Sequence, residues 1–113
     1  MALPQFNKNA TTEELRQLHT QARRASELMK ALSHETRLLI LCLLSEGEMS
    51  VSELEEIIGL SQAAVSQQLA RLRLERLVTT RRDGRQVYYQ IVDGEVSTLI
   101  ESLYDLFCKP VRE

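Results

Sequence analysis

The chain has 113 residues, of which 43% are hydrophobic, and its formal net charge is -2 at pH 7. This length and composition predict a single domain over residues 1–113, with a core modest enough that a partner subunit would stabilise it. The charge excludes a uniformly basic nucleic-acid binder. No apolar run reaches the roughly 18 residues of a membrane span, and residues 1–15 lack the layout of a secretory signal, so we expect a cytoplasmic protein without membrane association.

Residues 11–32 predict a first helix. Thr11 and Glu14 have the spacing of a capping box, and apolar side chains follow at steps of three and four residues. This stripe resembles a heptad seam, so the helix is expected to pack on its own domain or on a second subunit. Its members are Leu15, Leu18, Ala22, Ala25, Met29 and Leu32.

A second helix is predicted between Ser33, as its cap, and about Gly47. Residues 38–44 are apolar on every side of this helix, so we expect it to be the central buried element of the fold. Cys42 lies within it. A cysteine in such a run is most often a small core-filling residue, because free cysteine is among the most buried residue types.

Two further helices form a predicted helix-turn-helix. Ser50 and Glu53 form a second capping-box pattern, for a short helix that ends at Gly59, and Ser61 is the expected cap of the next helix. Two helices joined by a few residues around a glycine are typical of a DNA-binding unit, whose second helix lies in the major groove. The expected inward-facing residues are Leu54, Ile57 and Ile58 on the first helix and Val65, Leu69 and Leu72 on the second.

The stretch VTTRRDGRQVYYQI, residues 78–91, changes from helical to strand periodicity. It predicts a two-stranded hairpin about a tight turn at Asp83-Gly84, with Arg81, Arg82 and Arg85 around the tip. Such a hairpin after a helix-turn-helix is a wing. A last helix is predicted over about residues 94–108, with Pro110 marking its end.

Positive charge is concentrated between residues 71 and 85, from the end of the predicted second helix of the helix-turn-helix to the hairpin. Six arginines lie between positions 71 and 85, against Glu75 and Asp83, which gives a local balance of +4. A basic, solvated surface is the alternative to a binding site. Glutamine and serine side chains on the predicted second helix suit base edges, and arginines on the hairpin suit phosphates or a minor groove. We therefore predict binding to double-stranded DNA.

The sequence resembles the ArsR/SmtB family of winged helix-turn-helix repressors over nearly its whole length. The resemblance depends on LMKALSHETRLLIL at residues 28–41, LSQAAVSQQLARLR at residues 60–73 and GRQVYYQI at residues 84–91. It implies a mainly α-helical fold, with about five helices and a two-stranded wing, in a homodimer joined through its first and last helices. It also implies operator binding and release by an inducer. The expected DNA contacts are Gln62, Ala63, Ser66, Gln67, Arg71, Arg81, Arg82 and Arg85.

The metal sites of such repressors are not matched. Arsenic sensors of the family have a motif similar to ELCVCDL at the place of residues 48–54 of this chain. Here serines replace both cysteines of that motif, which removes the soft sulfur donors. Zinc sensors use ligands on the last helix, where this chain keeps Asp93 but has Leu106 and Lys109. His19 and His34 are isolated and expected at the surface. We predict no metal and no cofactor.

The two cysteines remain as the candidate sensor. Cys42 and Cys108 are 66 positions apart, which fits neither a zinc motif nor a secreted disulfide framework. The arrangement resembles the sulfide- and persulfide-responsive SqrR/BigR branch of the family, which carries one cysteine in each of these two helices. The resemblance implies that the reduced protein binds its operator. It also implies that reactive sulfur species bridge the two cysteines and that the bridged protein then releases the operator. If the pair were too far apart for direct closure, geometry would select persulfides.

Two alternatives use the same thiols. A repressor that senses peroxide or disulfide stress would form a direct disulfide between Cys42 and Cys108. A thiol enzyme is disfavoured, because the sequence has no Cys-x-x-Cys, no base near either cysteine and no phosphate-binding glycine loop. We therefore predict a regulator and not an enzyme.

Overall fold

A computed structural model describes residues 8–112, without the side chains of Glu95 and Arg112. Residues 1–7, part of the segment predicted to lack a secretory signal, lie outside this range. The chain divides into two units, Met1–Lys30 and Ala31–Glu113. None of the described helices has the length and apolar character needed to cross a membrane.

Helix α1, Thr12–Leu32, begins as predicted. The N–H of Thr11 donates to the Glu14 carboxylate and the N–H of Glu14 donates to the Thr11 hydroxyl, each over 3.1 Å, which forms the expected capping box. Most of the apolar stripe is accessible, with Leu15 42% and Leu18 39% exposed. The sequence predicted a packing surface, and the structure leaves that surface open in the single chain.

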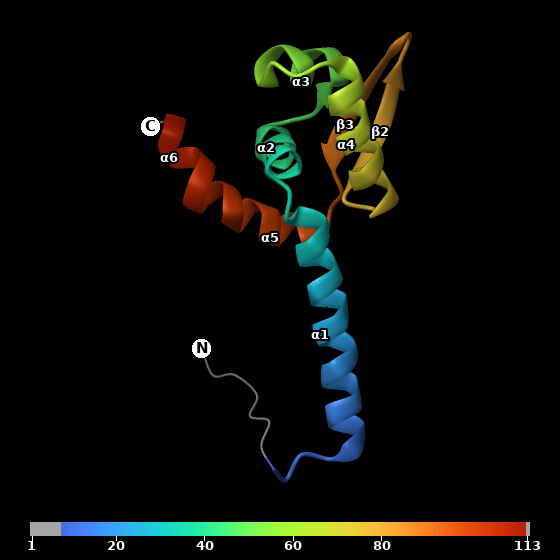
Figure 1. Ribbon diagram of the computed structural model, residues 1–113, viewed down its shortest axis with the longest axis vertical. Helices are drawn as coiled ribbons and strands as arrows, with labels where there is room; N and C mark the ends of the chain where they lie inside the picture. The colour runs from blue at the N-terminus through green and yellow to red at the C-terminus, as the bar shows by residue number, and fades with distance from the viewer. Residues whose placement is uncertain (1–7, 113) are drawn as a thin grey trace. The chain divides into compact units, whose positions relative to one another are not determined.

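The second unit is built around α2, Glu35–Leu44, which contacts α4, Gln62–Leu74, on one side and α5, Glu95–Leu103, on another (Figure 1). Ile40 and Leu41 are fully buried, whereas Leu38 and Leu39 are 40% and 42% exposed. The prediction that α2 is buried on every side is therefore wrong for the single chain. The cap was also wrong, because the helix starts from His34, whose carbonyl accepts from Leu38, and not from Ser33.

Helix α3, Val51–Ile58, has the predicted capping box between Ser50 and Glu53, and it ends at Gly59 in the left-handed region with a φ of 81°. Gly59 adopts this conformation at little cost because it has no Cβ. Leu54 is fully buried, as expected, but Ile57 is 56% exposed. The short helix therefore buries a narrower face than its sequence indicated.

The wing has one strand more than predicted. Strands β2, Val78–Asp83, and β3, Gln86–Ile91, form the expected antiparallel hairpin, and β1, Met49–Ser50, pairs with the other edge of β3. Asp83 pairs with Gln86, so the two-residue turn is Gly84-Arg85 and not Asp83-Gly84. Gly84 takes the positive φ of 63° at the first turn position, which suits a hairpin turn. The result is a three-stranded sheet in the order β1-β3-β2.

The C-terminal helix continues beyond its predicted end. Helix α5 is followed by a π-helical turn, η1, Tyr104–Cys108, and then by α6, Lys109–Arg112, so Pro110 lies within helical structure. The N–H of Lys109 reaches the carbonyl of Tyr104, one residue further back than in an α-helix. This wider turn accommodates a proline, which has no N–H to donate and whose ring would clash in a regular α-helix.

Candidate functional site

Helix α4 presents one apolar face to the core and a polar face to solvent. Val65, Leu69 and Leu72 are completely buried, and the Ser61 hydroxyl caps the helix by accepting from the N–H of Ala64 over 3.2 Å. The predicted DNA-reading residues lie on the other face. Of these, Gln62, Ala63, Gln67 and Arg71 are exposed and Ser66 is half-buried. The fold therefore gathers them on one accessible helix surface.

A contact that sequence reasoning missed fixes α4 to α2. The guanidinium of Arg37 donates through Nε to the carbonyl of Ala31 over 2.7 Å and through Nη1 to Oε1 of Gln68 over 3.1 Å. Gln68 directly follows the predicted DNA contact Gln67. Arg37 thus holds the carboxyl end of α1, the start of α2 and the middle of α4 together. Its only sequence signal was a charged residue at the start of an apolar helix.

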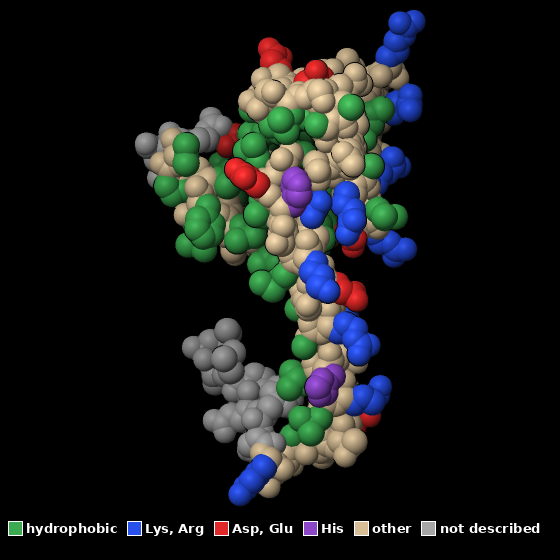
Figure 2. Space-filling model, in the orientation of Figure 1, with side chains coloured by type: hydrophobic (Ala, Val, Ile, Leu, Met, Phe, Trp, Pro, Cys, Tyr) green, Lys and Arg blue, Asp and Glu red, His purple; other side chains and the backbone are tan. Residues whose placement is uncertain are grey.

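The arginines of the wing differ in their surroundings. Arg81 donates from Nε and Nη2 to the Glu48 carboxylate, over 3.1 Å and 2.5 Å, and its guanidinium lies 4.8 Å from the ring centre of Tyr88. This hydrogen bond holds the pKa of Glu48 below its ordinary value. Arg71 pairs with Glu75 at 3.3 Å. Arg82 and Arg85 are exposed, and neither has an ion pair with any of the described side chains. Figure 2 shows basic side chains along the edge of the wing.

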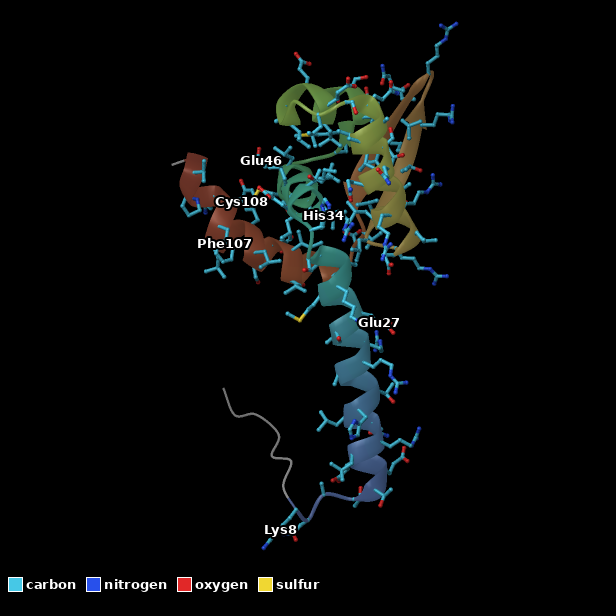
Figure 3. All side chains as sticks on the ribbon, in the orientation of Figure 1. Lys8, Glu27, His34, Glu46, Phe107 and Cys108 are labelled. Carbon is cyan, nitrogen blue, oxygen red and sulfur yellow. A yellow bond between two sulfur atoms is a disulfide. The ribbon has the colours of Figure 1, made fainter. Side chains whose placement is uncertain are left out.

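The two cysteines come together on facing elements. Cys42 of α2 and Cys108 of η1 are joined by a disulfide, with their Cα atoms 6.4 Å apart, and both residues are half-buried. Figure 3 shows the sulfur–sulfur bond between α2 and the C-terminal helix, close to Glu46. The separation lies within the range for a direct disulfide. Distance alone therefore does not select a longer sulfur bridge.

An open, apolar pocket of about 180 Å³ adjoins the disulfide. Beside it, the hydroxyl of Tyr104 donates to the Glu46 carboxylate over 2.9 Å. Sequence reasoning missed this pair, although Tyr104 precedes Cys108 by one helical turn and Glu46 follows Cys42 by the same step. The residues that line the pocket are Leu38, Leu41, Cys42, Ile100, Leu103, Tyr104, Phe107 and Cys108.

Of the positions considered as metal ligands, one caps a helix and three lie at the surface. Ser50, which stands where an arsenic sensor has a thiol, uses its hydroxyl to cap α3. His19, His34 and Asp93 are exposed. Within the described part of the chain, no group of three or more His, Cys, Asp or Glu side chains is placed to hold a metal ion.

The helix-turn-helix and the wing define a winged helix-turn-helix protein, with a disulfide between α2 and η1. Residues 34–80 match the arsR family of bacterial regulatory proteins. The biofilm growth-associated repressor of Xylella fastidiosa (strain Temecula1) is 42% identical over 96 residues, covering 85% of this chain and 84% of that protein. The regulator YgaV of Escherichia coli K12 is 45% identical over 96 residues, covering 84% and 97%.

Solved structures agree with these sequence matches. The repressor BigR from Xylella fastidiosa superimposes with a TM-score of 0.82 at 39% identity, covering 87% of this chain and 97% of that one. Reduced HlyU from Vibrio cholerae gives a TM-score of 0.78 at 41% identity, covering 83% and 99%. The chain therefore belongs to the arsR family and is a DNA-binding transcriptional regulator, not an enzyme.

Proposed function

We propose that this protein is a repressor that binds operator DNA when Cys42 and Cys108 are reduced and releases it when reactive sulfur species bridge them. The observation that carries this proposal is the link between Cys42 on α2 and Cys108 on η1. In a reducing cytoplasm such a link forms only conditionally, which is what a sensor requires. Two relatives with repressor in their names, from Xylella and Agrobacterium, support repression, whereas a Vibrio cholerae relative is named an activator.

The DNA-binding form is a homodimer in this proposal, with residues 1–113 forming one winged-helix domain and its terminal helices the dimer contacts. Large apolar side chains that are exposed on α1 and on the C-terminal helical segment support this arrangement, because a partner subunit would bury them. Two copies of α4 would then enter successive major grooves about 34 Å apart. The exposed apolar residues are Leu15, Leu18 and Met29 on α1 and Leu99, Leu106, Phe107 and Val111 near the C-terminus.

Contacts of α2 provide a route from the cysteines to the DNA. Cys42 lies near the carboxyl end of α2, and Arg37, near the start of the same helix, hydrogen-bonds Gln68 of α4. Any shift of α2 against α5 and η1 on bridging would therefore also displace α4. A difference of 1–3 kcal/mol in DNA affinity between the two forms is the usual size of such coupling.

Sulfane sulfur supplies the bridging chemistry. One cysteine thiolate takes a sulfur atom from a persulfide and releases a thiol, and the second cysteine then displaces hydrosulfide to leave a disulfide. Retention of further sulfur atoms gives a polysulfide bridge. The second candidate is direct oxidation by peroxide or a disulfide. The Cα separation of 6.4 Å in the disulfide-linked pair is compatible with it, as it is with the disulfide that the persulfide route leaves.

An operator-binding assay tests the switch. A duplex selected from a random pool with reduced protein is titrated with wild type, Cys42→Ser and Cys108→Ser, before and after treatment with glutathione persulfide. We expect all three reduced proteins to bind alike and treatment to release only wild type. Continued release of a double serine variant would contradict the proposal.

Mass spectrometry separates the two candidates. Wild type is treated in parallel with glutathione persulfide and with hydrogen peroxide, and both products are compared in mass and in DNA affinity. Rapid bridging by persulfide at concentrations where peroxide leaves the thiols intact supports sulfur sensing. Equal or faster closure by peroxide supports the oxidant sensor.

A further inference from the structure

We propose that the pocket beside the cysteine pair binds the apolar substituent of the sulfur donor. The preferred inducers are then neutral organic compounds of sulfane sulfur, such as dialkyl trisulfides, over donors with anionic substituents. This inference rests on the proposed function, because it names the substrate class of the same cysteine site.

The size of the pocket suits a short hydrocarbon group. Its volume is about 180 Å³, and an engineered apolar cavity of about 150 Å³ stays dry and binds benzene. Cys42 and Cys108 both belong to its wall, so a donor seated there brings its sulfur chain to the sulfur atoms that react with it.

The lining disfavours charge. The eight residues that line the pocket in the described part of the chain carry no charged side chain, and the hydroxyl of the one phenol among them, Tyr104, donates a hydrogen bond to Glu46. A carboxylate placed there would lose its hydration without a partner, which is costly. The Glu46 carboxylate beside the pocket adds repulsion toward anions. Lys109, which is exposed next to Cys108, would instead favour anionic donors. Control of donor choice by the pocket and control by Lys109 therefore predict opposite preferences.

The reaction balances with a trisulfide as the oxidant. A cysteine thiolate attacks the terminal sulfur of R–S–S–S–R, the adjacent sulfur–sulfur bond breaks, and R–S–S⁻ leaves and is protonated. The second cysteine then attacks the first cysteine's sulfur and expels R–S⁻, which is protonated in turn. The two cysteines lose two electrons and two protons and form the disulfide, and the trisulfide is reduced to R–SSH and R–SH.

A neutral donor and an anionic donor with substituents of equal carbon number test the inference. Dipropyl trisulfide and bis(2-carboxyethyl) trisulfide have substituents of equal carbon number, and the rate at which each consumes the thiols of reduced full-length protein is divided by its rate with free glutathione. Burial of a methylene group favours binding by roughly fourfold, and burial of an unpaired carboxylate is unfavourable. After division by the rates with glutathione, we therefore expect the neutral donor to react about tenfold faster or more.

Adjacent leucines on α2 provide a matched pair of variants. Leu38 and Leu39 are 40% and 42% exposed, but only Leu38 is among the residues that line the pocket. Leu38→Arg is expected to reduce or reverse the preference for the neutral donor, whereas Leu39→Arg leaves it unchanged. Each variant is compared with itself on two donors, so a change in overall thiol reactivity cancels in the ratio for a variant that folds.

The outcomes separate this inference from the proposed function. A corrected ratio near one, or a preference for the anionic donor, in wild type overturns the pocket inference while leaving the dithiol switch in place. Failure of both trisulfides and of glutathione persulfide to bridge the cysteines overturns the proposed function itself. If Leu38→Arg does not fold by circular dichroism, the wild-type ratio still decides the inference.

Discussion

The phenol of Tyr104 donates a hydrogen bond to the carboxylate of Glu46 over 2.9 Å, across the same junction that the disulfide closes. Tyr104 opens η1 and Cys108 ends it, and Glu46 lies just beyond the end of α2, which carries Cys42. A noncovalent contact therefore joins the two cysteine-bearing segments in parallel with the covalent one. Because it does not depend on the redox state of sulfur, it can keep the thiols near each other before they are bridged.

Removal of this hydrogen bond should weaken the reduced protein. Tyr104→Phe is expected to lower the free energy of unfolding by about 0.5–1.5 kcal/mol, because one accessible hydrogen bond is lost. It should also slow closure of the disulfide, because η1 is held less firmly against α2. Urea denaturation with reductant present measures the first effect, and thiol loss after oxidant addition measures the second. Tyr89→Phe on the wing is the control, and equal closure rates in both variants would contradict a positioning role for Tyr104.

Local features of the fold were predictable from the sequence. The capping boxes at Thr11 and Ser50 involve partners three residues apart, and their hydrogen bonds form within one helical turn. The buried stripe of α4 follows from periodicity alone, because its members recur on one face. Not every local feature was read correctly, because the cap of α2 is His34 and not Ser33, and the hairpin turn is Gly84-Arg85 and not Asp83-Gly84.

Contacts between distant segments were not predictable in this way. Strand β1 pairs Met49 with Tyr89, and a strand of two residues has no periodicity to detect. The Tyr104–Glu46 and Arg81–Glu48 contacts join positions 58 and 33 residues apart. Pro110 indicated a helix end because the rule assumes an α-helix, and the π-helical turn before it changed the outcome. The approach of the cysteines was an expectation from family resemblance, since neither cysteine carries a local signal for the other.

Arg37 should matter for both stability and DNA binding. Arg37→Ala removes two hydrogen bonds from a charged, half-buried donor, and we expect the free energy of unfolding to fall by about 1.5–3 kcal/mol. DNA affinity should fall as well, because α4 loses its link to α2 through Gln68. Urea denaturation and duplex titration measure these effects. Gln68→Ala, which removes only the second bond, should lose less stability, and an Arg37→Ala protein that is as stable as wild type would refute the assigned role.

The Glu48–Arg81 pair predicts a pH-dependent contribution to stability. The hydrogen bond from Arg81 lowers the pKa of Glu48 from its ordinary value of 4.5, so the ionised carboxylate favours the folded state. This contribution is fully present above about pH 4.5 and is lost as the pH falls through the lowered pKa. The Tm difference between wild type and Glu48→Gln should therefore be largest near neutral pH and shrink as the pH falls below 4.5. Glu56→Gln, on the exposed surface of α3, is the charge-matched control. A difference that grows in acid would contradict the assignment.

The arginines of the wing should contribute unequally to the salt dependence of DNA binding. Arg82 and Arg85 are exposed, with no ion pair to a described side chain, whereas Arg81 is held by Glu48. Each phosphate contact contributes about 0.9 to the slope of log affinity against log salt concentration. Arg82→Gln and Arg85→Gln should each reduce that slope by about 0.9 per subunit, whereas Arg81→Gln should change it less. Duplex titrations across a salt series measure the slopes. Because all three substitutions remove one positive charge, a uniform electrostatic effect would reduce the slopes equally. That result would show that the Glu48 pair does not restrain Arg81.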